Sequence, residues 1–284
     1  MMERRSPLAL ATLLLLAPRA FAGAPEAKGK RMNLAFVLLS EAKLPKGEAI
    51  ERAFASYAGK GQTLRFHPRT PKQADGGGTL EFEMGGGGSA LVALMPVPVP
   101  NQEADEAARY SVSALGGRWK LPPHKAHLVV TAQGAGTAVE ALAAFTSVVA
   151  AVVEASPAVG VYFGNAGATH DPKFFRDLAR EHDANAQLML WSGVSIAQAA
   201  GGRVELLSLG MKQLELPDLL LVAPAGKGNE ALPMLYDLLA YLVSRGAPLP
   251  EGDTVGRTAT EKLPVHYVPS PVDPKVKVWR VELK

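Results

Sequence analysis

The stretch HLVVTAQGAGTAVEAL, residues 127–142, joins an apolar run to a Gly-x-Gly loop and then to a segment of helical character. Loops that cradle phosphates have this order, but a dinucleotide loop needs glycine at position 139, where Val139 stands. The chain also contains no Gly-Lys-Ser/Thr triplet. Thr137 and Glu140 instead have the spacing of a capping box, in which each side chain accepts a backbone N–H bond at the helix start. We therefore predict a strand, a tight turn and a capped helix, and no nucleotide site.

The helix that begins in this stretch is predicted to run from about Ala138 to Ala155. It is apolar nearly all round from Ala141 to Val153, a length typical of a helix buried between layers and too short for a membrane span. The apolar segment VGVYFG follows it as a second strand. Strand, long helix and strand predict a crossover unit whose two strands are parallel.

The rest of the chain alternates short strands with amphipathic helices. The segments NLAFVLL, TLRFHP, AQLMLWSGV, GRVELLSL and LELPDLLLVAP are interpreted as strands, and TLEFEM and SALVALMP as a hairpin around Gly85–Gly88. Helices are predicted near residues 48–57, after a cap at Asn101, after Asp171 and Pro172, and over 232–245. The final segments LPVHYVP and VKVWRVEL alternate, which favours antiparallel or edge strands. The predicted fold class is α+β, with mixed, largely antiparallel sheets and packed helices.

The N-terminus has the layout of a secretory signal peptide over residues 1–22. Arg4 and Arg5 precede an apolar run, and the small residues Ala20 and Ala22 place the predicted cleavage between Ala22 and Gly23. Residues 23–32 are then a linker, 33–123 an N-terminal half and 124–284 a C-terminal half, forming separate domains or one continuous domain. The apolar run is too short for a permanent membrane anchor. The expected location is the periplasm or the medium, and the alternative is a cytoplasmic protein translated from Met32.

Composition excludes several classes of function. The net charge of the whole chain is +3, and residues 1–22 hold three arginines and one glutamate, so the chain from Gly23 onward is close to +1. That near balance lacks the basic footprint of a nucleic-acid binder. Cysteine is absent, which excludes disulfides and thiolate metal sites.

Five segments resemble a known bacterial family. ALMPVPVP, HKAHLVVTAQG, VGVYFGNAG, GMKQLELPDLLL and EGDTVGRTATEKLPV occur in the order and spacing of the family named domain of unknown function 4261, over about residues 33–283. One departure is RYSVSALGGRW, where the family usually carries a tryptophan-rich stretch. The resemblance implies a shared α+β fold without assigned chemistry, so no catalytic residue is carried over. It also implies a start near Asn33, which is compatible with either location.

The segment GNAGATHDP is the candidate ligand site. It leaves the end of a buried strand and enters a helix N-terminus, a place where ligands bind in α/β folds. Asn165, Thr169, His170 and Asp171 supply its polar groups. The structural alternative is that Asp171 caps the helix and His170 lies exposed beside it.

Other polar patterns favour structural roles. His124 and His127 are three apart, so on a strand they face opposite sides and cannot easily share a metal. The segment EGDTVG is interpreted as a plain turn, with cation binding through Asp253 and Thr254 as the alternative. Glu81 and Glu83 share one face of a hairpin strand and are interpreted as a solvated edge. No metal and no cofactor is predicted.

The absence of a nucleophile-elbow G-x-S-x-G motif lowers the case for a hydrolase of the α/β type. We therefore expect a non-catalytic, exported module that binds a partner protein or a small molecule. One alternative is a hydrolase or transferase that uses the Asn165–Asp171 loop. Another is a cytosolic immunity-like or regulatory protein, if translation starts at Met32.

Overall fold

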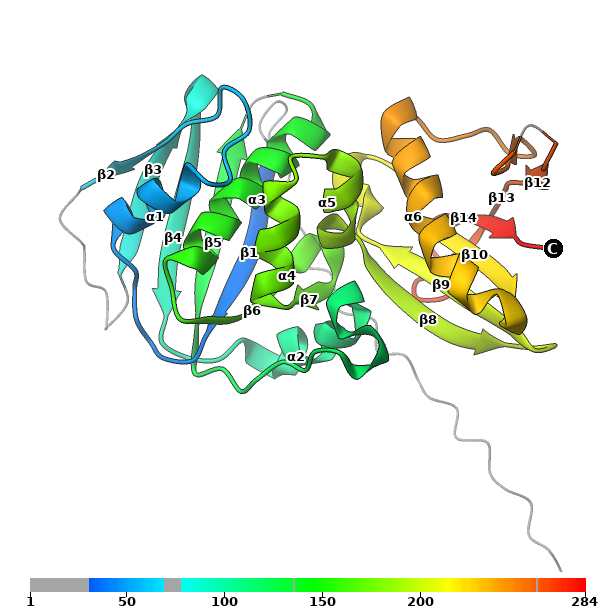
Figure 1. Ribbon diagram of the computed structural model, residues 1–284, viewed down its shortest axis with the longest axis horizontal. Coiled ribbons are helices and arrows are strands. Elements are labelled where there is room, and N and C mark those ends of the chain that lie inside the picture. The colour runs from blue at the N-terminus through cyan, green and yellow to red at the C-terminus, as the bar shows by residue number, and fades with distance from the viewer. Residues whose placement is uncertain (1–30, 69–77, 135, 259) are drawn as a thin grey trace, which may run out of the picture.

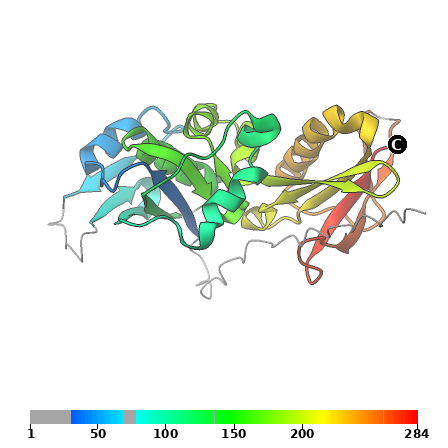
Figure 2. The same ribbon diagram turned by 90° about the horizontal axis from the view of Figure 1, so that it is seen from below.

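The computed structural model describes residues 31–68, 78–134, 136–258 and 260–284. The predicted signal peptide 1–22, its cleavage site between Ala22 and Gly23, and most of the linker lie outside the described residues. Two main sheets lie one after the other along the long axis of the molecule, and helices pack on a face of each (Figures 1 and 2).

Within the described part of the chain, the first sheet has seven antiparallel strands in the order β2-β3-β4-β5-β1-β6-β7. Its strands are β1 (Arg31–Leu39), β2 (Leu64–His67), β3 (Thr79–Met84), β4 (Gly88–Met95), β5 (Ala126–Gly134), β6 (Ala158–Phe163) and β7 (Ala168–His170). Because β5 and β6 both pair antiparallel with β1, they are parallel to each other. The helix α3 (Ala138–Glu154) connects them, so the predicted crossover is confirmed, with β1 between its two strands.

The turn from β5 into α3 has the predicted capping box. Thr137 Oγ1 accepts from the Glu140 backbone N–H at 3.2 Å, and Glu140 Oε2 accepts from the Thr137 backbone N–H at 2.8 Å. Gly136 has a φ of 107°, a left-handed conformation that glycine adopts without strain. These residues start a helix, as the sequence indicated.

Helices cover one face of the first sheet. α1 (Gly47–Phe54), α3 and α4 (Pro172–Arg180) lie on the same side of it (Figure 1). From Leu142 to Val153, α3 is buried on nearly every side except at Ala143 and Ala144, which are half-buried. Its apolar character therefore reflects a position between the sheet and other helices.

The short helix α2 (Glu103–Ala107) packs on the opposite face, where Ala104 and Ala107 contact Leu38 and Tyr162. The prediction that Asn101 caps this helix is wrong. Asn101 belongs to a 3-10 turn that Pro100 opens, and it has a φ of 58°. The residue at the cap position is Gln102, whose side chain makes no capping bond.

The second main sheet has the order β13-β14-β10-β9-β8. Its strands are β8 (Gly193–Ala199), β9 (Arg203–Leu209), β10 (Leu219–Pro224), β13 (His266–Pro269) and β14 (Lys277–Glu282); β11 (Thr254–Val255) and β12 (Leu263–Pro264) form a separate pair. Among the described residues of this sheet, only the β10–β14 pair is parallel. The helix α6 (Gly228–Arg245) lies on one face of this sheet (Figures 1 and 2).

The segment AQLMLW, predicted as the start of a strand, is helical instead. It belongs to α5 (Ala184–Trp191), which the Asp183 side chain caps through the Asn185 backbone N–H. A short apolar run fits a buried helix as well as a buried strand, so periodicity alone did not separate them. Trp191 is fully buried and its Nε1 donates to Thr146 Oγ1 of α3 at 2.8 Å.

The largest hydrophobic cluster includes buried residues of both main sheets, such as Leu128 of β5 and Leu221 of β10. The predicted boundary between halves at residue 123 falls between β4 and β5, which are hydrogen-bonded neighbours in one sheet. The change of sheet comes between β7 and β8. The α+β class with largely antiparallel sheets is confirmed. Across the ranges that the structure describes, the helices are too short or too polar to cross a bilayer.

Candidate functional site

The four residues of the predicted ligand site do not converge on a cavity. Asn165 is exposed at the end of β6, whereas Thr169 and His170 lie in β7 and are fully buried. Thr169 Oγ1 donates to the Ala104 carbonyl at 2.6 Å. Asp171 caps α4 by accepting from the Phe174 backbone N–H at 2.8 Å, as the structural alternative proposed. That alternative was wrong about His170, which it placed in solvent.

A chain of hydrogen bonds surrounds His170. Its Nε2 lies 3.1 Å from the Leu190 carbonyl, which can only accept, so Nε2 carries the proton and Nδ1 is free to accept. Ser111 Oγ therefore donates to Nδ1 at 2.7 Å, and Ser113 Oγ donates to Ser111 Oγ at 2.7 Å. Ser113 Oγ in turn accepts from the Asp171 backbone N–H at 3.1 Å. The chain ties the 3-10 segment Val112–Gly117 to β7 and α5.

A serine hydroxyl that is hydrogen-bonded to a histidine is also the arrangement of a catalytic nucleophile and its base. The surroundings of His170 oppose that role. Burial lowers the pKa of His170 to about 4, so the ring is neutral at pH 7 and is a weak base. The group behind the ring is the Leu190 carbonyl, whereas a carboxylate would be needed to stabilise an imidazolium. Ser111 is fully buried as well, so no substrate reaches it in this conformation.

The paired histidines 124 and 127 hold the Pro-rich segment after β4. His124 Nε2 accepts from the Val99 backbone N–H at 3.1 Å, and His127 Nδ1 bonds the Val97 carbonyl at 2.8 Å. Burial lowers the pKa of His127. These bonds agree with the structural role predicted for the pair.

The remaining polar patterns also have local explanations. The Asp253 carboxylate accepts from the Thr254 backbone N–H at 2.9 Å, within a turn in which Gly252 has a φ of 80°. His67 lies 3.3 Å from Glu83 at the exposed edge of the hairpin. Over the described ranges, no three His, Asp or Glu side chains are grouped as a metal site would need.

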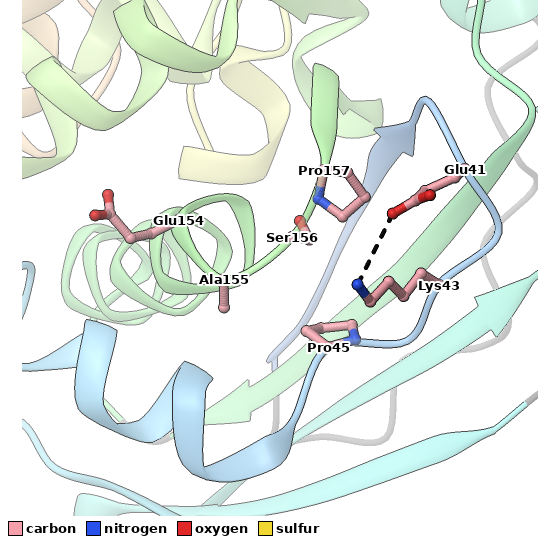
Figure 3. Close-up of a pocket in the computed structure, with 7 residues that line it drawn as sticks. All are labelled: Glu41, Lys43, Pro45, Glu154, Ala155, Ser156 and Pro157. Carbon is pink, nitrogen blue, oxygen red and sulfur yellow. Dashed lines mark ion pairs between the residues drawn. The ribbon is translucent and has the colours of Figure 1, made fainter.

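One surface pocket, of about 260 Å³, lies between the loop after β1 and the end of α3 (Figure 3). Glu41 and Lys43, both from the loop, form an ion pair of 3.9 Å on one side of it. The Glu154 carboxylate points away from that pair and accepts from Tyr57 Oη at 2.6 Å and Arg176 Nη1 at 2.8 Å. Burial and the bond to Glu154 raise the pKa of Tyr57. Because these charges already pair within the chain, they offer little to a ligand.

A second pocket, of about 300 Å³, lies on the face of the second sheet opposite α6. Its lining is Arg203, Pro264, His266, Arg280, Glu282, Leu283 and Lys284. It therefore has three cationic side chains and one carboxylate beside a histidine. Sequence reasoning missed this site. The signal was present in GRVELLSL and VKVWRVEL, where charged residues at alternate positions share one face of each strand.

Comparison with known proteins gives one result. The family model described as Domain of unknown function (DUF4261) matches residues 207–282. No curated protein and no solved structure matches the chain. The matched segment runs from β9 to the end of β14 and contains α6 and most of the second sheet. The resemblance of residues 33–206 to the same family stays a prediction. Over residues 207–282, about a quarter of its length, the chain is similar to the family described as domain of unknown function 4261.

Proposed function

We propose that this protein is an exported, non-catalytic module that binds a partner protein or a small molecule through its second sheet. The observation that carries the proposal is the contrast between two groups of polar residues. Thr169, His170 and Asp171 bond backbone groups and hold the fold together. Arg203 and Arg280, in contrast, stand at a surface pocket and are about one-third exposed. A residue whose pKa is shifted while its polar groups serve only to stabilise the fold argues against catalysis at the predicted loop.

Binding is tested by native mass spectrometry of protein purified from its own cells. The expected result is a bound ligand or partner that is retained by the wild type and lost from a variant with Arg203→Gln and Arg280→Gln. The control is Arg245→Gln, which removes one arginine charge at the exposed end of α6, outside the pocket. A ligand retained equally by all three proteins would place binding elsewhere and overturn the assignment to the second sheet.

Export is supported by the N-terminal sequence and is tested by intact mass after cell fractionation. A chain that begins at Gly23 in the periplasm or the medium is the expected result. A chain that begins at Met32 in the cytosol would overturn export and favour the regulatory or immunity-like alternative.

The second candidate function is a hydrolase or transferase, and the bond between Ser111 and His170 favours it. A double variant with His170→Ala and Asp171→Ala tests it against a panel of activated ester substrates. A turnover that the wild type shows and the double variant loses, with an unchanged circular dichroism spectrum, would overturn the binding proposal. Equal turnover in both proteins, or turnover in neither, rules out this loop as the catalytic site.

A further inference from the structure

The pocket on the second sheet is organised around a single internal carboxylate. In the sheet, β10 lies between β9 and β14 (Figure 1), yet Arg203 of β9 reaches across it to Glu282 of β14. Arg203 Nη1 lies 2.9 Å from Glu282 Oε2, and Arg280 Nη2 lies 2.5 Å from Glu282 Oε1. Each carboxylate oxygen thus has its own guanidinium, an arrangement that suits a planar carboxylate.

Glu282 does not neutralise all the positive charge of the pocket. One carboxylate is shared by two arginines, and Lys284 adds a further positive side chain to the lining. Arg203 Nε is buried and finds no hydrogen-bond partner among the described residues. His266 stands beside Arg280 in the neighbouring strand, and its Nδ1 bonds Glu251 Oε1 at 2.8 Å. A buried donor without a partner is unfavourable, so Glu282 leaves part of the hydrogen-bonding capacity of Arg203 unused.

Because these side chains are partly exposed, a ligand can replace Glu282 as the partner of the two arginines. The side chains of Arg203, Arg280 and Glu282 are 33%, 37% and 39% exposed, so solvent screens their attraction and each ion pair is weak. A pocket of about 300 Å³ is at the lower end of the volumes that hold small molecules. It has room for a ligand the size of a short dicarboxylate.

We propose that this pocket binds a small carboxylate-bearing ligand, which takes the place of Glu282 between Arg203 and Arg280. Glu282 is then a built-in competitor that weakens binding and disfavours anions unable to engage both guanidinium groups. This inference rests on the proposed function and names the chemistry of its ligand.

The experiment is calorimetric titration of the full chain with succinate, and separately with inorganic phosphate, at low ionic strength, where surface attraction is least screened. Glu282→Gln keeps the shape of the side chain and removes its charge. Because each exposed ion pair contributes little, we expect Glu282→Gln to bind succinate about three- to tenfold more tightly than the wild type. The double variant with Arg203→Gln and Arg280→Gln is expected to bind at least about tenfold more weakly, since it loses both charge-assisted contacts.

Arg245→Gln is the control for net charge and should bind as the wild type does. Thermal melting of each variant shows whether it is folded. A Glu282→Gln variant that is folded and binds succinate no better than the wild type would overturn the proposal. Phosphate bound as tightly as succinate would overturn the preference for carboxylates. If neither anion binds any variant but native mass spectrometry finds another ligand, the carboxylate inference fails and the proposed function stands.

Discussion

Asp218 gives a sharp test, because its carboxylate is half-buried at the turn that enters β10. Its Oδ1 accepts from Ser208 Oγ at 3.0 Å and from the Met211 backbone N–H at 3.1 Å. Burial nevertheless outweighs these bonds and raises the pKa of Asp218 from 3.8 to about 6. The perturbation is Asp218→Asn, which keeps an acceptor oxygen in place and removes the ionisable group.

The direction in which stability changes with pH follows from which state, folded or unfolded, binds the proton more tightly. Between pH 4 and pH 6 the folded protein keeps the Asp218 proton and the unfolded chain loses it, so stability falls as pH rises. A shift of about two pKa units, at about 1.4 kcal/mol each, corresponds to about 3 kcal/mol. This contribution is fully present below pH 4 and is lost as pH rises through 6. Asp218→Asn has no such loss, so it should gain about 3 kcal/mol relative to the wild type between pH 4 and pH 7.

The assay is urea unfolding of both proteins at half-unit steps from pH 3.5 to pH 7.5. Other carboxylates, such as Glu154 and Glu261, have lowered pKa values and contribute pH dependence of the opposite sign. The difference between wild type and variant cancels those contributions. A difference that is flat across the range, or a wild type that gains relative stability as pH rises, would refute the claim that burial controls this carboxylate.

Three further predictions concern the fold. Thr137→Ala should lower the free energy of unfolding by about 1 kcal/mol in urea titrations, because it removes the cap of α3, while Thr137→Ser should retain most of it. Gly210→Ala should destabilise more than Gly201→Ala: both glycines have positive φ, but a Cβ at Gly210 would lie 2.5 Å from the Asn165 carbonyl oxygen, and Gly201 has open space. Equal melting temperatures for the two variants would contradict the close packing at Gly210. Because burial lowers the pKa of His170 from 6.5 to about 4, its contribution of about 3 kcal/mol is present above pH 6.5 and lost as pH falls to 4. A His170→Gln variant should lack that acid dependence, and an unchanged slope of stability with pH would contradict it.

The candidate sites show where prediction from sequence stopped. The position of the Asn165–Asp171 loop between a strand and a helix was identified from local patterns, as was the cap at Asp171. The burial of His170 was not predictable, because Ser111 and Leu190 are 59 and 20 residues away in sequence. The pocket at Arg203 and Glu282 was missed for a similar reason: alternation shows that both are on solvent-facing sides of strands, but not that one strand lies between them.

The sequence by itself determined the features that depend on neighbours a few residues apart. These are the capping box at Thr137, the glycine turn of the β3–β4 hairpin and the apolar helix α3. Such features depend mainly on interactions between residues that are close in sequence. The local pattern of residues is therefore sufficient to predict them. The final strands were predicted only in part, because β14 is an internal strand that pairs parallel with β10. Only the tertiary structure decided that β1 lies between β5 and β6, that residues 184–191 are helical, and that Arg203 meets Glu282 across β10. Those outcomes depend on which distant apolar surfaces bury each other, and the energy of that burial is not a property of any single segment.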